Sequence, residues 1–265
     1  MELITIILSS LLAIVSPVGI FVDQAAENAI RSQLYDVEEL RVRVDNAPNF
    51  RLLQGKVDQV RIAGRGLYPR PELRVALLDI ETDPIDVDVG DLQQGEITLD
   101  QPLQAAVHIV LDEADLNVFL QSPTLAEFFE DLSFDFSSPI KARNAKRYRL
   151  SNPNIDLLES NRIRLQANLE DQVLTENLTL VLEAGFVVID GRQLQIINPQ
   201  ILIGGEAAPS QLVVKLTEGL FEQLSLRRLE ESGIVARVLE FGIDGQEIKL
   251  AFFVRVEPSS TLLGN

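Results

Sequence analysis

The sequence predicts an α+β fold, in which a strongly curved antiparallel β-sheet wraps around a long α-helix and an apolar helix precedes both. Three observations predict it. Many segments alternate apolar and polar residues with period two, which is typical of half-buried strands. Residues 209–231 repeat leucine every four positions, which gives a helix of about 30 Å. Residues 3–22 carry no charge.

The apolar N-terminal segment, residues 1–22, contains an uncharged stretch at 3–22 that is long enough to cross a bilayer. Glu2 stands where a secretory signal normally has basic residues. Three interpretations stay open: a membrane anchor or uncleaved signal, a signal cleaved near Ala25-Ala26, and a buried core helix. The first two place the rest of the chain outside the cytosol, and we expect a membrane-associated protein on the non-cytosolic side.

One domain is expected from residue 23 to residue 257, followed by a loose tail at 258–265. An amphipathic helix is predicted at 23–34. Alternation then predicts strands, and the sequences Asp190-Gly191 and Asp244-Gly245 predict tight turns between the later ones. The predicted strands are 40–44, 56–63, 73–80, 85–89, 96–100, 103–111, 163–169, 178–189, 194–203, 238–243 and 248–256.

The middle of the chain changes period at Asp112. Residues 103–111 alternate as a strand, whereas Asp112 and the acidic residues after it supply a helix cap and a negative first turn. Leu116, Phe119 and Leu120 share one face of this short helix, which Ser122-Pro123 ends. Pro209 opens the long helix, and Gly233 ends it.

Composition excludes several kinds of chemistry. The chain has no cysteine, so disulfides, thiolate nucleophiles and cysteine-ligated metals are excluded. A net charge of −17 repels polyanions and argues against nucleic acid as a partner. No Lys or Arg occurs from residue 75 to residue 140, and a basic run follows directly. This run consists of Lys141, Arg143, Lys146, Arg147 and Arg149.

No catalytic residue, metal site or cofactor is predicted. His108 is the only histidine, so a catalytic triad or a zinc site would lack members, and its place in the alternation predicts a solvent-facing strand residue. Gly64-Arg65-Gly66 lacks the third glycine of a dinucleotide fingerprint. The best candidates for metal ligands are Asp83, Asp86, Asp88 and Asp91. Their spacing does not match that of a calcium-binding loop. Because acidic and apolar residues alternate in this segment, the carboxylates are expected to form a solvent-facing side of a strand.

Several segments resemble the LmeA-like phospholipid-binding family of bacterial envelope proteins. They are 94–123, Leu52-Leu53-Gln54-Gly55-Lys56-Val57, Ile62-Ala63-Gly64-Arg65-Gly66-Leu67, Glu81-Thr82-Asp83-Pro84-Ile85 and Asp115-Leu116-Asn117. The resemblance covers about residues 23–257. It implies a tubular lipid-binding fold with an apolar groove between sheet and helix, and phospholipid binding without a catalytic motif.

We therefore predict a non-enzymatic phospholipid-binding or lipid-transfer protein of the cell envelope or internal membranes. Its partners would be a phospholipid or another acyl-chain lipid and a membrane surface. The predicted groove residues are Leu116, Phe119, Leu120, Phe128, Phe129, Leu216, Leu220 and Phe221. The basic run is the predicted headgroup or membrane contact. Two alternatives stay open: an envelope scaffold or protein-interaction module with a filled core, and a hydrolase that uses two carboxylates.

Overall fold

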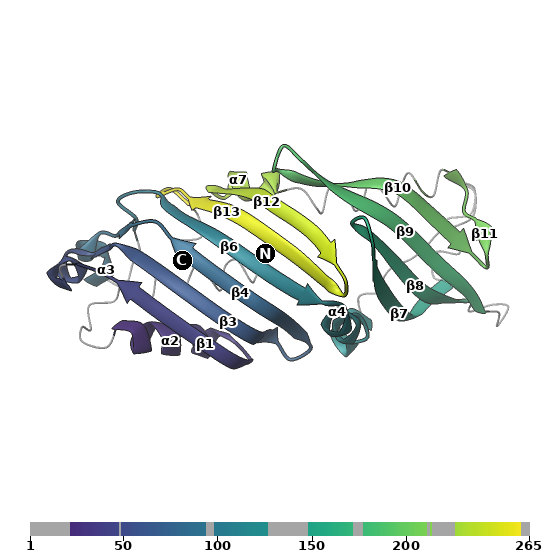
Figure 1. The fold of residues 1–265 in the computed structure, drawn as a ribbon, viewed down its shortest axis with the longest axis horizontal. Coiled ribbons are helices and arrows are strands. Elements are labelled where there is room, and N and C mark those ends of the chain that lie inside the picture. Colours follow the sequence, from purple (N-terminus) through teal and green to yellow (C-terminus); the bar gives the residue numbers. More distant parts are fainter. Residues whose placement is uncertain are drawn as a thin grey trace.

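Two antiparallel sheets lie side by side along the length of the molecule (Figure 1). The computed structural model describes residues 22–47, 49–93, 98–126, 148–171, 177–210, 213 and 226–260. The larger sheet has six strands in the order β1-β3-β4-β6-β13-β12, and the smaller has five in the order β11-β10-β9-β8-β7. A short pair, β2 (Lys56–Val57) and β5 (Ile85–Asp86), forms a third sheet.

The six-stranded sheet combines both ends of the described chain. Its strands are β1 (Asp36–Asp45), β3 (Gln59–Arg70), β4 (Leu73–Thr82), β6 (Leu103–Asp112), β12 (Ile234–Asp244) and β13 (Glu247–Val256). The C-terminal hairpin β12–β13 pairs with β6 along its whole length. The chain that follows β6 cannot add another strand at that edge, and it starts a second sheet instead.

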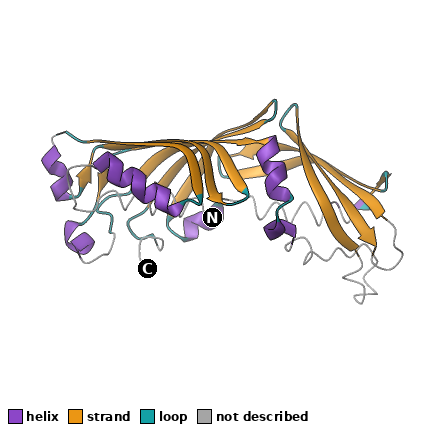
Figure 2. Cartoon of the chain, turned by 90° about the horizontal axis from the view of Figure 1, so that it is seen from below, coloured by secondary structure: helices purple, strands orange, loops and turns teal. Residues whose placement is uncertain are grey.

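Helices cover one face of the six-stranded sheet (Figure 2). Alternation along β1 and β3 sends Leu40, Val42 and Ile62 to this face, where they pack in one buried cluster with Ala26 and Ile30 of α2 (Val22–Gln33). We call it the apolar face, and the opposite one the open face. Three shorter helices also lie near this sheet: η1 (Asn49–Gln54), α3 (Val89–Gln93) and α7 (Arg227–Glu231).

The five-stranded sheet is a meander of adjacent hairpins: β7 (Tyr148–Leu158), β8 (Arg162–Asp171), β9 (Asn177–Ile189), β10 (Gln193–Ile203) and the two-residue β11 (Glu206–Ala207). Its turn at Asp190-Gly191 has positive φ at both residues, 52° and 63°, and confirms the tight turn that the sequence predicted. Asn-Pro pairs interrupt β7 at 152–153 and β10 at 198–199, where the register shifts and each Asn has positive φ.

The helix α4 (Glu113–Leu120) joins the two sheets. Arg74 at the start of β4 reaches it through Asp115, at 2.7 Å, and also contacts Glu38 of β1 at 2.9 Å. Asp112 occupies the predicted N-cap position but makes no capping hydrogen bond with its side chain; it lies 3.5 Å from Arg74. Arg74 therefore links α4 to strands β4 and β1 of the six-stranded sheet.

The predicted strands are largely confirmed, but the expected strongly curved sheet around a long helix is wrong for the part of the chain that the structure describes. Two sheets are present because β13 occupies the edge of β6, and the longest described helix is α2, with 12 residues. Residues 211–212 and 214–225 of the predicted long helix lie outside the described residues, and α7 covers its end. Strand β7 was not predicted.

The N-terminal segment cannot be compared with its three interpretations, because residues 1–21 lie outside the described residues. Among the helices that are described, none combines the length and the apolar character that a membrane crossing requires.

Candidate functional site

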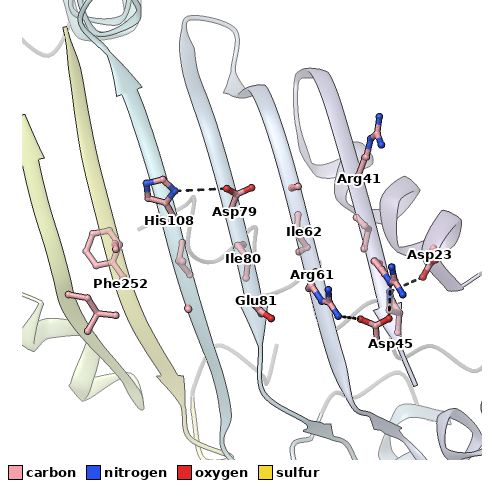
Figure 3. A pocket seen from close by; sticks show the side chains of 18 residues that line it. Asp23, Arg41, Asp45, Arg61, Ile62, Asp79, Ile80, Glu81, His108 and Phe252 are labelled. Atoms are coloured by element: carbon pink, nitrogen blue, oxygen red, sulfur yellow. Dashed lines mark hydrogen bonds and ion pairs between the residues drawn. The ribbon is translucent and has the colours of Figure 1, made fainter. Parts of the chain in front are cut away.

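A shallow hollow of about 960 Å³ crosses the open face of the six-stranded sheet (Figure 3). Strand pairing brings residues of five strands into one row, Arg41–Ala63–Asp79–His108–Ala251. The two alanines leave the sheet surface low between longer charged side chains. Val42, Ile62 and Ile80 also border the hollow, but their side chains are buried in the core of the apolar face. The hollow is thus a depression in a solvent-facing surface.

Charges of both signs alternate around this hollow. Asp45 accepts hydrogen bonds from Arg43 at 2.7 Å and from Arg61 at 2.5 Å. The hydrogen bond from Arg43 lowers the pKa of Asp45 below its ordinary value. His108 lies 3.9 Å from Asp79, and its exposed position confirms the sequence prediction. The charges satisfy one another, so the hollow has no single sign that would select an ion.

The pKa of Asp45 makes this residue unsuited to act as a general acid. A general acid needs a raised pKa, whereas that of Asp45 is lowered. In the described ranges, no group of three or more His, Asp and Glu side chains could hold a metal ion. Of the acidic residues weighed as calcium ligands, Asp86 pairs with Lys56 at 2.8 Å, and Asp88 accepts a hydrogen bond from the backbone N–H of Asp91.

A second surface, predominantly apolar, lies on the other side of the strands. The apolar face of the six-stranded sheet contains the large buried cluster described above. The five-stranded sheet has its own smaller cluster, formed by Leu150, Ala167, Leu169, Leu180 and Ile201. Cross-strand pairing extends the same face of β9 through Leu182, Ala184 and Phe186 toward the first sheet.

The apolar faces of the two sheets meet at Phe186 of β9 and Phe241 of β12. Their ring centroids lie 6.1 Å apart, with the planes tilted by 54°. Backbone contacts fix this junction, because Val238 N–H donates to the carbonyl of Gly191 at 2.7 Å. The side-chain amide oxygen of Asn161 also accepts from Ile243 N–H at 2.9 Å.

The side chains around this ring contact are only half-buried, in contrast to the two clusters on either side. We call them the junction surface: Ile109, Leu111, Ile163, Leu165, Leu182, Phe186, Phe241, Ile243 and Leu250. Pairing of β6 with β13 and of β13 with β12 puts Ile109, Leu250 and Phe241 in one cross-strand row. The junction surface is therefore an apolar area, bounded at both ends by filled core, that keeps partial contact with solvent.

The sequence-predicted groove residues are only partly described. Leu116, Phe119 and Leu120 of α4 are half-buried beside the junction of the two sheets. Phe128, Phe129, Leu216, Leu220 and Phe221 lie outside the described residues, as do Lys141, Arg143, Lys146 and Arg147. Arg149 is in β7, opposite Glu170, but the position of its side chain is not described. The assignment of these residues to a lipid site stays a prediction.

Sequence reasoning missed both the hollow and the junction surface. Alternation does place Arg41, Ala63 and His108 on the polar side of their strands, but the order of strands decides which of them become neighbours. Likewise, Phe186 and Phe241 each continue an apolar alternation, and only the contact between sheets brings them together.

The architecture defines a β-sheet protein with a charged open face and an apolar opposite face whose side chains are half-buried where the two sheets meet. The chain belongs to the LmeA-like phospholipid-binding family, whose model matches residues 16–253. This match confirms the resemblance noted in the sequence, and the family is named for binding rather than for catalysis. Comparisons with curated proteins and with solved structures gave no significant match.

Proposed function

We propose that this chain is a non-enzymatic phospholipid-binding protein that receives acyl chains on the junction surface. Membership of the LmeA-like family supports binding of phospholipid. We choose this surface because of the contact between Phe186 and Phe241. The contact joins the apolar faces of the two sheets, and the apolar side chains near it are half-buried. A half-buried apolar surface where two sheets meet can receive an acyl chain, and this supports a lipid site over the scaffold alternative.

The energetics of acyl-chain burial support this surface. Each methylene removed from water contributes about 0.8 kcal/mol, so sheltering most of one long acyl chain could contribute about 10 kcal/mol before ordering costs. No polar chemistry is needed for that part of the ligand. The charged hollow is an unsuitable place for it, because polar side chains surround it and the strands separate it from the junction surface.

The headgroup would lie near the predicted basic run, Lys141, Arg143, Lys146, Arg147 and Arg149. Basic side chains attract anionic lipid at about 1 kcal/mol per residue near a surface, even when the rest of the protein is acidic. The apolar N-terminal segment would keep the protein at a membrane of the cell envelope, on the non-cytosolic side. Transfer of lipid between membranes would use the same surface.

The test compares two neighbouring residues of β9 whose side chains point to opposite faces. Leu182 is on the apolar face, and Val181 on the other, paired with Gln166 and Leu202; both are half-buried. Binding of a phospholipid with a fluorophore on one acyl chain is measured for the full chain and for Leu182→Gln and Val181→Gln. We expect about tenfold weaker binding or more for Leu182→Gln, which corresponds to about 1.4 kcal/mol, and little change for Val181→Gln.

Thermal unfolding of both variants shows whether each is folded. Native mass spectrometry of the membrane-extracted chain adds a direct observation of bound lipid. Equal binding by the two variants would exclude the junction surface, whereas wild-type chain without bound lipid and without affinity for the probe would exclude the proposed function itself.

A further inference from the structure

The first strand of the six-stranded sheet, β1, is an edge that differs from the other sheet edges. It pairs with β3 from Asp36 to Asp45 without a register shift and contains no proline (Figure 1). Among the described residues, no strand pairs with its other side. Long, regular edge strands of this kind are templates for pairing with another chain.

The other edges are closed by local devices. Side chains of α4 bond to the backbone of β7, and the Asn-Pro irregularities at 152–153 and 198–199 interrupt β7 and β10. Strand β12 has a register shift at Leu239 and donates backbone hydrogen bonds to Gly191 and to the side chain of Asn161. Strand β1 has one such bond, from Val44 N–H to the side chain of Asp23 near its C-terminal end, and no register shift or proline elsewhere along its length.

The backbone of β1 offers hydrogen bonds on its outer side. The N–H of Val44 points away from β3, because it donates to the side chain of Asp23 at 2.8 Å. Alternation gives the N–H groups of Val42 and Leu40 the same outward direction. Helix α2 packs against the apolar face of the sheet through Ala26 and Ile30, so the body of the helix lies on that face of β1.

We propose that β1 pairs antiparallel with β1 of a second copy of this chain. A two-fold axis through Leu40 places residue i opposite residue 80 − i. Leu40 then faces Leu40 of the second copy, and Val42 faces Glu38. On the open face, Glu39 of each copy lies opposite Arg41 of the other, which makes two cross-strand pairs of opposite charge. Both side chains are exposed, Glu39 by 50% and Arg41 by 81%, and contact each other within one strand at 3.1 Å.

Charge also distinguishes this register from two neighbouring ones. A two-fold axis through Arg41 would place the two Arg41 side chains opposite each other, although Glu39 would then face Arg43. A two-fold axis through Val42 would place Arg41 opposite Arg43 and Glu39 opposite Asp45, so every charged pair would repel. The net charge of −17 on each copy opposes association at long range, but at physiological ionic strength charges are screened beyond about 8 Å. The short cross-strand pairs keep most of their attraction under the same conditions.

The test uses complementary charge reversals in the full chain. Molar mass is measured by sedimentation in a mild detergent at physiological salt for wild type, Glu39→Arg, Arg41→Glu and the two variants mixed in equal amounts. We expect wild type at twice the chain mass of 29.4 kDa, each variant alone at the single mass, and the mixture restored to the double mass. In the mixture, two arginines of one copy face two glutamates of the other. Glu240→Arg, which reverses an exposed charge on the far edge strand, should remain a dimer.

A wild-type chain that is monomeric at every concentration would overturn the proposal. A dimer that persists in both single variants would also overturn it, because another surface would then hold the copies together. Both substituted side chains are exposed, and circular dichroism shows that the variants are folded. Lipid binding does not enter this measurement, so its outcome is independent of the proposed function.

Discussion

The side-chain amide of Asn117 in α4 bonds to both backbone groups of Ile155 in β7. It donates to the carbonyl at 2.9 Å and accepts from the N–H at 2.7 Å. One turn before it, the carboxylate of Glu113 accepts from Leu157 N–H, and one turn after it, Gln121 donates to the carbonyl of Pro153. Spacing of four residues puts these three side chains on one face of the helix, so α4 supplies the partners that a neighbouring strand would give β7.

Replacing Asn117 by Leu should destabilise the fold. The substitution keeps a similar volume but leaves the N–H and the carbonyl of Ile155 without their partner. Unsatisfied part-buried backbone groups cost about 1–3 kcal/mol, and we expect a loss of that size in the free energy of unfolding, measured with urea. Val118→Leu changes the next residue of the same helix, which is 61% exposed, and should leave stability within about 0.5 kcal/mol of wild type. Equal stability of the two variants would show that the Asn117 bonds contribute nothing.

Substitution of Arg74 by Met should loosen α4 from the six-stranded sheet. Arg74 is 25% exposed and bonds to Glu38 and Asp115, and these bonds raise its pKa and lower that of Glu38. Without it, Asp112 and Asp115 repel each other without a counter-ion. We expect about 1–2 kcal/mol lower stability and faster amide hydrogen exchange in α4. Arg192→Met, at an exposed arginine in the turn between β9 and β10, should change neither quantity. An unchanged exchange rate in Arg74→Met would refute this role.

The pH dependence of stability should reveal Asp112. Its burial, followed by the charges of Asp115 and Glu247, raises its pKa above the ordinary value of 3.8. A carboxyl whose pKa is higher in the folded state favours folding while it is protonated, and that contribution is lost as the pH rises through the folded-state pKa. Asp112→Asn should therefore stabilise the protein by a few tenths of a kcal/mol at neutral pH, because the side chain is partly screened by solvent. The gain should vanish below about pH 3.

Asp244 provides the control of opposite sign. The hydrogen bond from Lys249 lowers the pKa of Asp244, so its contribution to stability is present above its ordinary pKa and is lost as the pH falls. Asp244→Asn should therefore lower the melting temperature slightly at neutral pH and have no effect in acid. Melting curves of both variants over a pH series would test the two signs together; a gain in Asp112→Asn that persists in acid would contradict the explanation.

Gly55 should tolerate no side chain. Its φ is +76°, and an added Cβ would lie 2.2 Å from the carbonyl oxygen of Val87. We expect Gly55→Ala to cost about 3 kcal/mol or more, since both the backbone conformation and the clash oppose it. Gly245→Ala is the matched control, because Gly245 has φ of +63° but nothing within 4 Å of the added atom. A cost of only about 1–2 kcal/mol is expected there. Similar chemical-denaturation midpoints for the two variants would rule out the close contact with Val87.

The sequence was sufficient for elements whose signal is local. Period-two alternation located β6, β9 and β10, and Asp190-Gly191 located a turn, because side-chain direction and positive φ are properties of a few consecutive residues. Strand β7 escaped prediction because Asn152, Pro153 and Asn154 interrupt its alternation. The division into two sheets was not predicted either, because this division depends on the pairing of β13 with β6, which are separated by more than a hundred residues in the sequence.

The candidate lipid surface was predictable in kind but not in place. The alternation of apolar and polar residues predicted that each strand has an apolar face, and the family resemblance implied acyl-chain binding. The half-buried junction, however, depends on a contact between Phe186 and Phe241, which belong to different sheets. No local sequence pattern predicts such a contact. The same reason explains why the bonds from Asn117 to Ile155 could not be foreseen.

The separation of the charged hollow from the junction surface gives the molecule a definite orientation. A side chain such as His108 and one such as Ile109 follow each other in β6, yet they face opposite sides of the same thin sheet. If acyl chains enter from the apolar side, as we propose, the charged side stays in contact with water, and we expect the protein to approach a bilayer with its apolar side first. Labelling reagents confined to the aqueous phase would then reach the ring of His108 equally well in the presence and in the absence of vesicles.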